Sequence, residues 1–171
     1  MKFNKNAQAW GFDLMIASIV FITGIVIFYI YTLNYPKESQ DKLDKLNYAG
    51  ESIAQNLLDT GYPESWDVFT VSRIGLTTEN KINQTKLDQF YLLASEPTNP
   101  QGYAQAKSLF RTNYEFFVNF SAPITIDGNT IEENGIGKDF SGQNSGSLIK
   151  TTRLTIYENK AVTLYVYVWE Y

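Results

Sequence analysis

The sequence predicts an α+β protein in which a long N-terminal helix packs on a C-terminal antiparallel β-sheet. The first half of that helix is expected to be transmembrane and the second half amphipathic. Three observations lead to this fold: residues 12–33 are an uninterrupted apolar run, residues 36–59 carry apolar side chains at three- and four-residue spacing, and from residue 113 apolar side chains alternate with a period of two. Helices followed by strands are typical of the α+β class.

The apolar run predicts a transmembrane helix that stays with the protein. Its one charge, Asp13, lies at its start. As a helix, the run is about 33 Å long, which is enough to cross the hydrocarbon core of a bilayer. A cleavable secretion signal has a shorter apolar core, of roughly 7–15 residues, followed by small residues at the cut. Here the run is longer, and its end, with Thr32, Leu33 and Asn34, is a poor cut site.

The flanks of this helix predict its orientation and the division into domains. Lys2 and Lys5 lie before it without any acid, whereas lysines and acids are mixed after it. The positive-inside rule therefore places the N-terminus in the cytoplasm. We expect a cytoplasmic leader over residues 1–11, a transmembrane helix over residues 12–34 and an extracellular α+β domain over residues 35–171.

The extracellular domain is predicted to begin with three helices. The first, over residues 36–59, buries a stripe formed by Leu43, Leu46, Gly50, Ile53, Ala54 and Leu57, and it ends with Gly61 as its C′ residue. Asn83 is expected to cap a second helix over residues 84–94, and Asn99 with Pro100 to start a third over residues 100–110. In the intervening segment, Trp66 and Gly75 are interpreted as packing and turn residues.

Strands are predicted for the rest of the chain. A strand from residue 113 leads into a hairpin that turns at Asp127-Gly128, and a glycine-rich loop covers residues 134–147. Two further strands are joined at residues 158–160. In the last strand we expect one set of alternating side chains to face the helix and the other set to face outward. The inward set is Val162, Leu164, Val166 and Val168; the outward set is Thr163, Tyr165, Tyr167 and Trp169.

Composition excludes several kinds of function. The chain of 171 residues has a net charge of −4, no cysteine and no histidine. Disulfides, Ser-His-Asp and Cys-His catalysis and the common zinc sites are therefore excluded. No basic face that would suit a nucleic acid is visible. Asp127, Asn129, Glu132 and Glu133 could gather around a calcium ion, but they do not follow an EF-hand loop, and Asp127 and Asn129 are interpreted as turn residues. We expect no enzyme activity, no cofactor and no metal.

The N-terminal junction carries a family resemblance. The short basic leader MKFNKNAQAWG ends in Gly11 directly before the apolar helix, and this resembles archaeal type IV pilin-like proteins with a class III signal peptide. The resemblance implies that a prepilin peptidase in the membrane cuts between Gly11 and Phe12 and that the helix is retained. Bacterial members usually carry glutamate at the fifth mature position, where this chain has Ile16. A cut beside residues 7–8, and no cut at all, remain alternatives.

The resemblance also implies roles in filament assembly. Asp13 is interpreted either as an acid favoured by the helix dipole in the first turn or as a partner for a neighbouring subunit's N-terminal amine. Ala17 and Gly24 are seven residues apart, so they lie on nearly the same helix face, where small side chains permit close packing. Two sequons could carry N-glycans: Asn83, expected at an exposed helix start, and Asn119, expected within a strand.

Together these observations predict a structural subunit, major or minor, of an archaeal type IV pilus-like filament. Its expected partners are the membrane, the prepilin peptidase and other copies or other pilin-like subunits, and its place is the cell membrane or an adhesive surface pilus. The alternative is a solitary bitopic membrane protein whose outer domain binds a ligand or another protein. A membrane-tethered enzyme comes third, because the sequence offers no nucleophile paired with a base.

Overall fold

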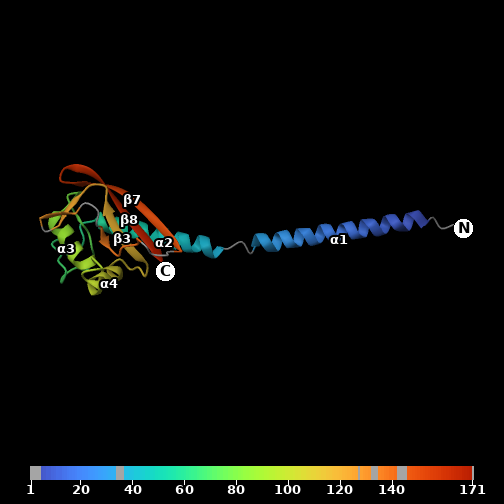
Figure 1. Cartoon of the computed structure of the whole chain (residues 1–171), viewed down its shortest axis with the longest axis horizontal. Helices are drawn as coiled ribbons and strands as arrows, with labels where there is room; N and C mark the ends of the chain where they lie inside the picture. The colour runs from blue at the N-terminus through green and yellow to red at the C-terminus, as the bar shows by residue number, and fades with distance from the viewer. Residues whose placement is uncertain (1–4, 34–36, 127, 132–134, 142–145, 171) are drawn as a thin grey trace. The chain divides into compact units, whose positions relative to one another are not determined.

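A computed structural model describes residues 5–33, 37–126, 128–131, 135–141 and 146–170. The chain divides into two compact units, residues 1–41 and 42–171. The first contains helix α1 (Lys5–Leu33) and the start of helix α2 (Lys37–Leu57). The second contains the rest of α2 and all the other helices and strands (Figure 1). An apolar N-terminal helix and a C-terminal antiparallel sheet confirm the α+β prediction in outline.

Helix α2 buries the apolar stripe that its periodicity predicts. Leu46, Ile53, Ala54 and Leu57 are fully buried, whereas Leu43 at the start of the stripe is exposed. At Gly50 the helix backbone lies directly on the sheet: a Cβ there would be 2.6 Å from the hydroxyl of Thr151. Glycine at this position is therefore required by the close approach of helix and strand.

The predicted end of this helix is wrong in detail. Gly61 is not its C′ residue, because α2 ends at Leu57 and Gly61 lies four residues later with φ +76. The last carbonyl groups are instead used by an incoming segment of chain. The Leu57 carbonyl accepts a hydrogen bond from the Leu76 N–H at 2.9 Å, and the Asp59 carbonyl accepts one from the Thr77 N–H at 3.1 Å. Tertiary pairing thus satisfies groups that a glycine cap would satisfy locally.

The two short helices begin where their capping residues predict. Helix α3 (Gln84–Ala94) follows Asn83, whose side chain accepts a hydrogen bond from the Lys86 N–H. Helix α4 (Pro100–Leu109) follows Asn99, whose side chain accepts one from the Gly102 N–H at 2.9 Å. In both cases an asparagine oxygen satisfies a backbone donor of the first turn, which is the reason that sequence alone places these helix starts well.

The main sheet has four antiparallel strands in the order β6-β3-β8-β7. They are β3 (Glu115–Phe120), β6 (Ile136–Gly137), β7 (Ser147–Tyr157) and β8 (Lys160–Glu170). Two small hairpins complete the fold: β1 (Thr77–Thr78) with β2 (Lys81–Ile82), and β4 (Ile124–Ile126) with β5 (Asn129–Ile131). In the β7–β8 turn Glu158 has φ 49 and Asn159 φ 62, as a two-residue I′ turn requires.

Two sequence predictions for this sheet need correction. The segment interpreted as a glycine-rich loop contains strand β6, which pairs with β3 through Val118 and Ile136. Trp169 does not face outward into solvent, because it is fully buried. The ring of Phe140 covers it edge-on at a centroid distance of 5.9 Å and also stacks on Tyr167 at 4.8 Å. The inward prediction for Val162, Leu164, Val166 and Val168 is confirmed.

Candidate membrane and assembly site

Helix α1 is long and apolar enough over its 24 residues Trp10–Leu33 to cross a membrane, judged by length and composition. None of this stretch is buried by the chain itself. The exposed side chains include Phe21, Ile22 and Phe28, which soluble domains bury in their cores. Such a surface needs an apolar surrounding, either lipid or other apolar helices.

The hydroxyl groups of α1 do not prevent such burial. The Thr23 hydroxyl donates to the Ile19 carbonyl at 2.7 Å, and the Thr32 hydroxyl donates to the Phe28 carbonyl at 2.8 Å. Each hydrogen bond spans one helical turn, so these two polar groups are satisfied within the helix. A satisfied hydroxyl costs far less to transfer into an apolar environment than an unpaired one.

The processing residues lie inside α1. The helix begins at Lys5, so the expected leader already adopts helical structure before Gly11 and Phe12. The first turn of α1 in the intact chain contains no acid, so Asp13 lies outside that turn. It would lie in the first turn only if the chain began at Phe12. Glycine within a helix costs about 1 kcal/mol relative to alanine, so Gly11 weakens α1 locally at this position.

The small residues of α1 leave unused space. Ala17 and Gly24 are exposed, and a Cβ at Gly24 would meet no other atom of the chain within 4 Å. The same holds for Gly11. In contrast to Gly50, where glycine is required by the chain's own packing, Gly24 has no such role within the described chain.

The structure separates the two sequons. Asn83 is half-buried, not exposed as expected, and its amide nitrogen donates to the Thr78 hydroxyl at 3.3 Å while its oxygen caps α3. Asn119 lies opposite Tyr165 on the outward face of β3, half-buried, with its oxygen accepting from the Phe120 N–H at 2.7 Å. A glycan replaces one of the two hydrogens of the amide nitrogen, so a glycan on Asn83 could keep the bond to Thr78 only through the remaining N–H. Among the described residues, the nitrogen of Asn119 makes no such bond.

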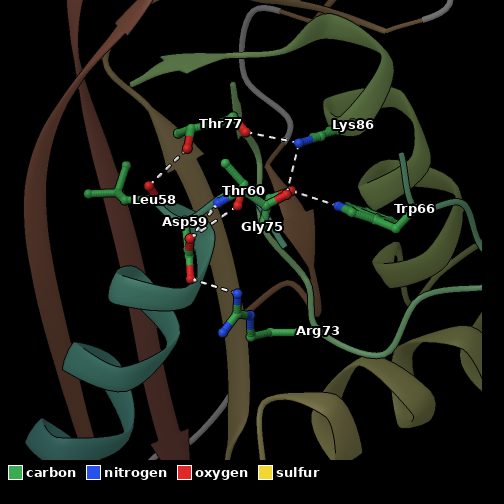
Figure 2. A network of polar contacts seen from close by, with 8 residues as sticks. All are labelled: Leu58, Asp59, Thr60, Trp66, Arg73, Gly75, Thr77 and Lys86. Carbon is green, nitrogen blue, oxygen red and sulfur yellow. Dashed lines mark hydrogen bonds and ion pairs between the residues drawn. The ribbon is translucent and has the colours of Figure 1, made fainter. Parts of the chain in front are cut away.

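A network of polar contacts fixes the segment that connects α2 to the β1–β2 hairpin (Figure 2). The indole N–H of Trp66, which is buried, donates to the Gly75 carbonyl at 2.8 Å. Arg73 pairs with Asp59 at 3.2 Å, and the Thr77 hydroxyl donates to the Leu58 carbonyl at 2.9 Å. The prediction that Trp66 and Gly75 serve packing is confirmed.

Lys86 lies at the centre of this network and was missed by sequence analysis. Lys86 is buried, with 5% of its surface exposed. Its ammonium donates to the carbonyls of Thr60 at 2.8 Å and Thr77 at 2.9 Å (Figure 2). Desolvation by burial lowers the pKa of Lys86, and the nearby Glu64 and Asp59 carboxylates oppose this. The only sequence signal is that Lys86 follows the capping Asn83 in the first turn of α3, which favours neither burial nor exposure.

A second polar cluster joins α4 to the sheet. Glu115 accepts a hydrogen bond from the Tyr103 hydroxyl and pairs with Lys107, both at 2.8 Å, and the Tyr103 hydroxyl accepts from the Phe116 N–H at 2.9 Å. Burial alone would raise the pKa of Glu115, but the bonds from Lys107 and Tyr103 outweigh it and lower the pKa. Burial raises the pKa of Tyr103. All members have partners, so the cluster functions as a brace.

Among the residues that the structure describes, no group of three or more Asp, Glu, His or Cys side chains could hold a metal ion. Asp127, Glu132 and Glu133 lie outside the described residues. Comparisons with protein-family models, with curated proteins and with solved structures found no match to this chain.

Proposed function

We propose that this chain is a structural subunit, major or minor, of an archaeal type IV pilus-like filament, assembled through α1. The supporting observation is a 24-residue apolar helix that the chain leaves entirely unburied, followed in sequence by an amphipathic helix that packs on an antiparallel sheet. In this proposal residues 35–171 face outward, and a prepilin peptidase cuts the Gly11–Phe12 bond on the cytoplasmic side of the membrane.

The proposal accounts for the exposed apolar surface of α1. In a bilayer, lipid solvates the apolar side chains of α1, and no hydrophobic force drives copies together. In a filament, the same side chains are buried against neighbouring copies. At about 25 cal/mol per Å² of apolar area kept from water, that burial supplies many kcal/mol per subunit. One helix thus serves as membrane anchor before assembly and as core afterwards.

Processing is tested by the intact mass of the protein extracted from membranes. Loss of residues 1–11 supports the proposal, because a retained helix with a removed leader distinguishes this pathway from ordinary secretion. Glycans at Asn83 or Asn119 would add to the same mass and can be assigned by changing each asparagine to glutamine. Gly11→Trp should block the cut, since a bulky side chain hinders entry of the backbone into a peptidase cleft.

Filament formation is tested by shearing cells and comparing the released chain with the membrane-bound chain. An intact leader together with no sheared filament would refute the proposal and favour the solitary bitopic membrane protein. Normal maturation of the Gly11→Trp chain would place the cut at another bond. An intact leader in a chain that still forms filaments would refute the processing step alone.

A further inference from the structure

The loop between α2 and β1 displays a phenylalanine in a braced turn. Phe69 is 95% exposed, more than any of the other large apolar side chains described as exposed. It lies within a turn closed by Asp67, whose carboxylate accepts hydrogen bonds from the Phe69 N–H at 2.9 Å, the Thr70 N–H at 2.8 Å and the Thr70 hydroxyl at 2.8 Å. An apolar ring in such a turn loses little conformational freedom on binding.

The base of this turn is also fixed. The Val68 N–H donates to the side-chain oxygen of Gln89 on α3 at 3.2 Å, and Trp66 is held to Gly75. We call residues 66–70 the Phe69 turn. It is acidic: from Thr60 to Ser72 the chain contains Glu64 and Asp67 and no lysine or arginine. The hydrogen bond from the Thr70 hydroxyl, followed by those from the Thr70 and Phe69 N–H groups, lowers the pKa of Asp67, so this carboxylate carries its charge at neutral pH.

The same domain carries a groove whose chemistry complements this turn. The groove has a volume of about 1040 Å³ and lies between α2 and residues 109–114. Ala49, Leu109, Phe110 and Tyr114 supply its apolar lining, with the exposed ring of Tyr48 beside them. Ligand pockets in proteins have volumes of about 300–1,000 Å³, so the groove has room for a whole turn of chain.

The rim of the groove is predominantly basic. Lys45, Arg73 and Arg111 line it, together with the acids Asp44 and Glu170. Glu170 is already paired with Lys42 at 2.9 Å and Arg73 with Asp59 at 3.2 Å, so the remaining rim charges are Lys45, Arg111 and Asp44. An apolar floor within a charged rim is the usual anatomy of a protein interface. The rim favours an occupant that combines an apolar side chain with negative charge, and the Phe69 turn has both.

We propose that the Phe69 turn of one copy docks into the groove of a neighbouring copy, with the Phe69 ring on the apolar floor and Glu64 and Asp67 facing the basic rim. In a filament the contact is heterologous: each copy offers its turn to one neighbour and its groove to another, and such a contact generates an open assembly when its rotation does not close a ring. Phe69 does not fill the groove of its own domain, because it is 95% exposed.

This inference rests on the proposed function, because the filament supplies the effective concentration that a contact of this size needs. Subunits joined through α1 keep their outer domains at millimolar effective concentration, where a weak contact becomes populated. The docking contact would then set the register of neighbouring outer domains. Complete burial of a phenylalanine changes an equilibrium by about 10- to 100-fold.

The first test places a photoreactive ring in the turn of the full-length chain. Phe69→p-benzoylphenylalanine keeps an aromatic ring at this position, and the same substitution at Leu154, 77% exposed on β7, is the matched control. After irradiation of sheared filaments, we expect probe 69 to cross-link to residues 43–57 or 109–114 of a second copy. Probe 154 should not give these products.

The second test measures the energetic effect of the contact. Phe69→Ser should lower the ratio of sheared filament to membrane-bound subunit by about tenfold or more, whereas Leu154→Ser should leave it unchanged. Normal filaments in Phe69→Ser, or filaments in which probe 69 cross-links to lipid, to another protein or elsewhere on a second copy, would overturn this inference and leave the proposed function intact. No filament in the unmodified strain would overturn both.

Discussion

Replacing Trp66 by phenylalanine removes a hydrogen bond that holds the Phe69 turn to the domain. Trp66 is 2% exposed, and its indole N–H donates to the Gly75 carbonyl at 2.8 Å. Phenylalanine keeps an aromatic ring in the core but has no donor. Gly75 lies close against another backbone segment, because a Cβ built there would lie 2.2 Å from the backbone nitrogen of Gly61. The two backbone segments are already in contact there.

The expected loss of stability has two parts. A buried carbonyl that loses its donor costs about 1–3 kcal/mol. The part of the indole that phenylalanine does not fill leaves a void, which costs about 1 kcal/mol more. The sum of about 2–4 kcal/mol is a large share of a typical unfolding free energy of about 5–15 kcal/mol. For a domain of this size it corresponds to a fall in Tm of about 5–15 °C.

The assay is thermal unfolding of the full-length chain in detergent, followed by near-ultraviolet circular dichroism, which reports the packing of aromatic side chains. Trp10→Phe is the matched control, because Trp10 is 81% exposed on α1 and undergoes the same chemical change. We expect Trp10→Phe to leave Tm unchanged. A Trp66→Phe chain whose Tm falls no further than that of the control would refute the assigned role of the Trp66–Gly75 hydrogen bond.

Three further predictions concern α1, the membrane topology and acid stability. Gly24→Leu should insert normally, since leucine is more apolar, yet lower the ratio of sheared filament to membrane-bound chain by holding neighbouring helices apart; an unchanged ratio at normal membrane levels would exclude packing through this face. In the Gly11→Trp chain, which should keep its leader, Asn4→Cys should resist an impermeant thiol reagent in intact cells whereas Ser39→Cys reacts, and the reverse pattern would invert the topology, since the chain has no other thiol. Glu115 has a pKa lowered from 4.5, so its stabilisation is present above that value and is lost as the pH falls through its folded pKa. The Tm difference between wild type and Glu115→Gln should therefore shrink from about pH 7 to about pH 3, and a constant difference would contradict the brace.

Sequence predicted well those features that depend on neighbours along the chain. Asn83 and Asn99 cap their helices because a side-chain oxygen reaches an N–H three residues ahead, which is a purely local bond. The two-residue turn Glu158-Asn159 and the alternation along β8 are equally local. The helix, strand and turn patterns therefore predicted the α+β order before any tertiary contact was known.

Features that depend on distant contacts could not be predicted in this way. Strand β6 has two residues, too few for a periodic pattern, and exists because Gly135 allows the chain within reach of β3: a Cβ there would lie 2.2 Å from the Val118 carbonyl. Trp169 follows an outward alternation but is buried, with the ring of Phe140 lying edge-on against it. Lys86 is buried because two carbonyls from other segments converge on its ammonium.

The candidate site also has features that the sequence predicts and features that it does not. The membrane helix could be predicted because its signal is the composition of consecutive residues, and the described Trp10–Leu33 stretch bears out its length. The Phe69 turn and the groove could not be predicted, since exposure of Phe69 is a property of the folded domain. In the sequence DVFT, phenylalanine next to valine indicates a buried strand as readily as an exposed turn.

The apolar residues of this chain form a buried set in the domain and an exposed set on α1. The buried core of the described residues extends from Leu46 to Trp169, whereas the apolar side chains of α1 are exposed. In the proposed pathway, the domain of residues 42–171 therefore keeps a core of its own while α1 is in the membrane, and extraction of α1 requires no refolding of that core. A single α1 in water would expose its whole apolar surface, at about 25 cal/mol per Å². In the proposed pathway, each helix must therefore leave the lipid directly into contact with other copies, and the domain contacts at Phe69 can form only after that step has brought the domains together.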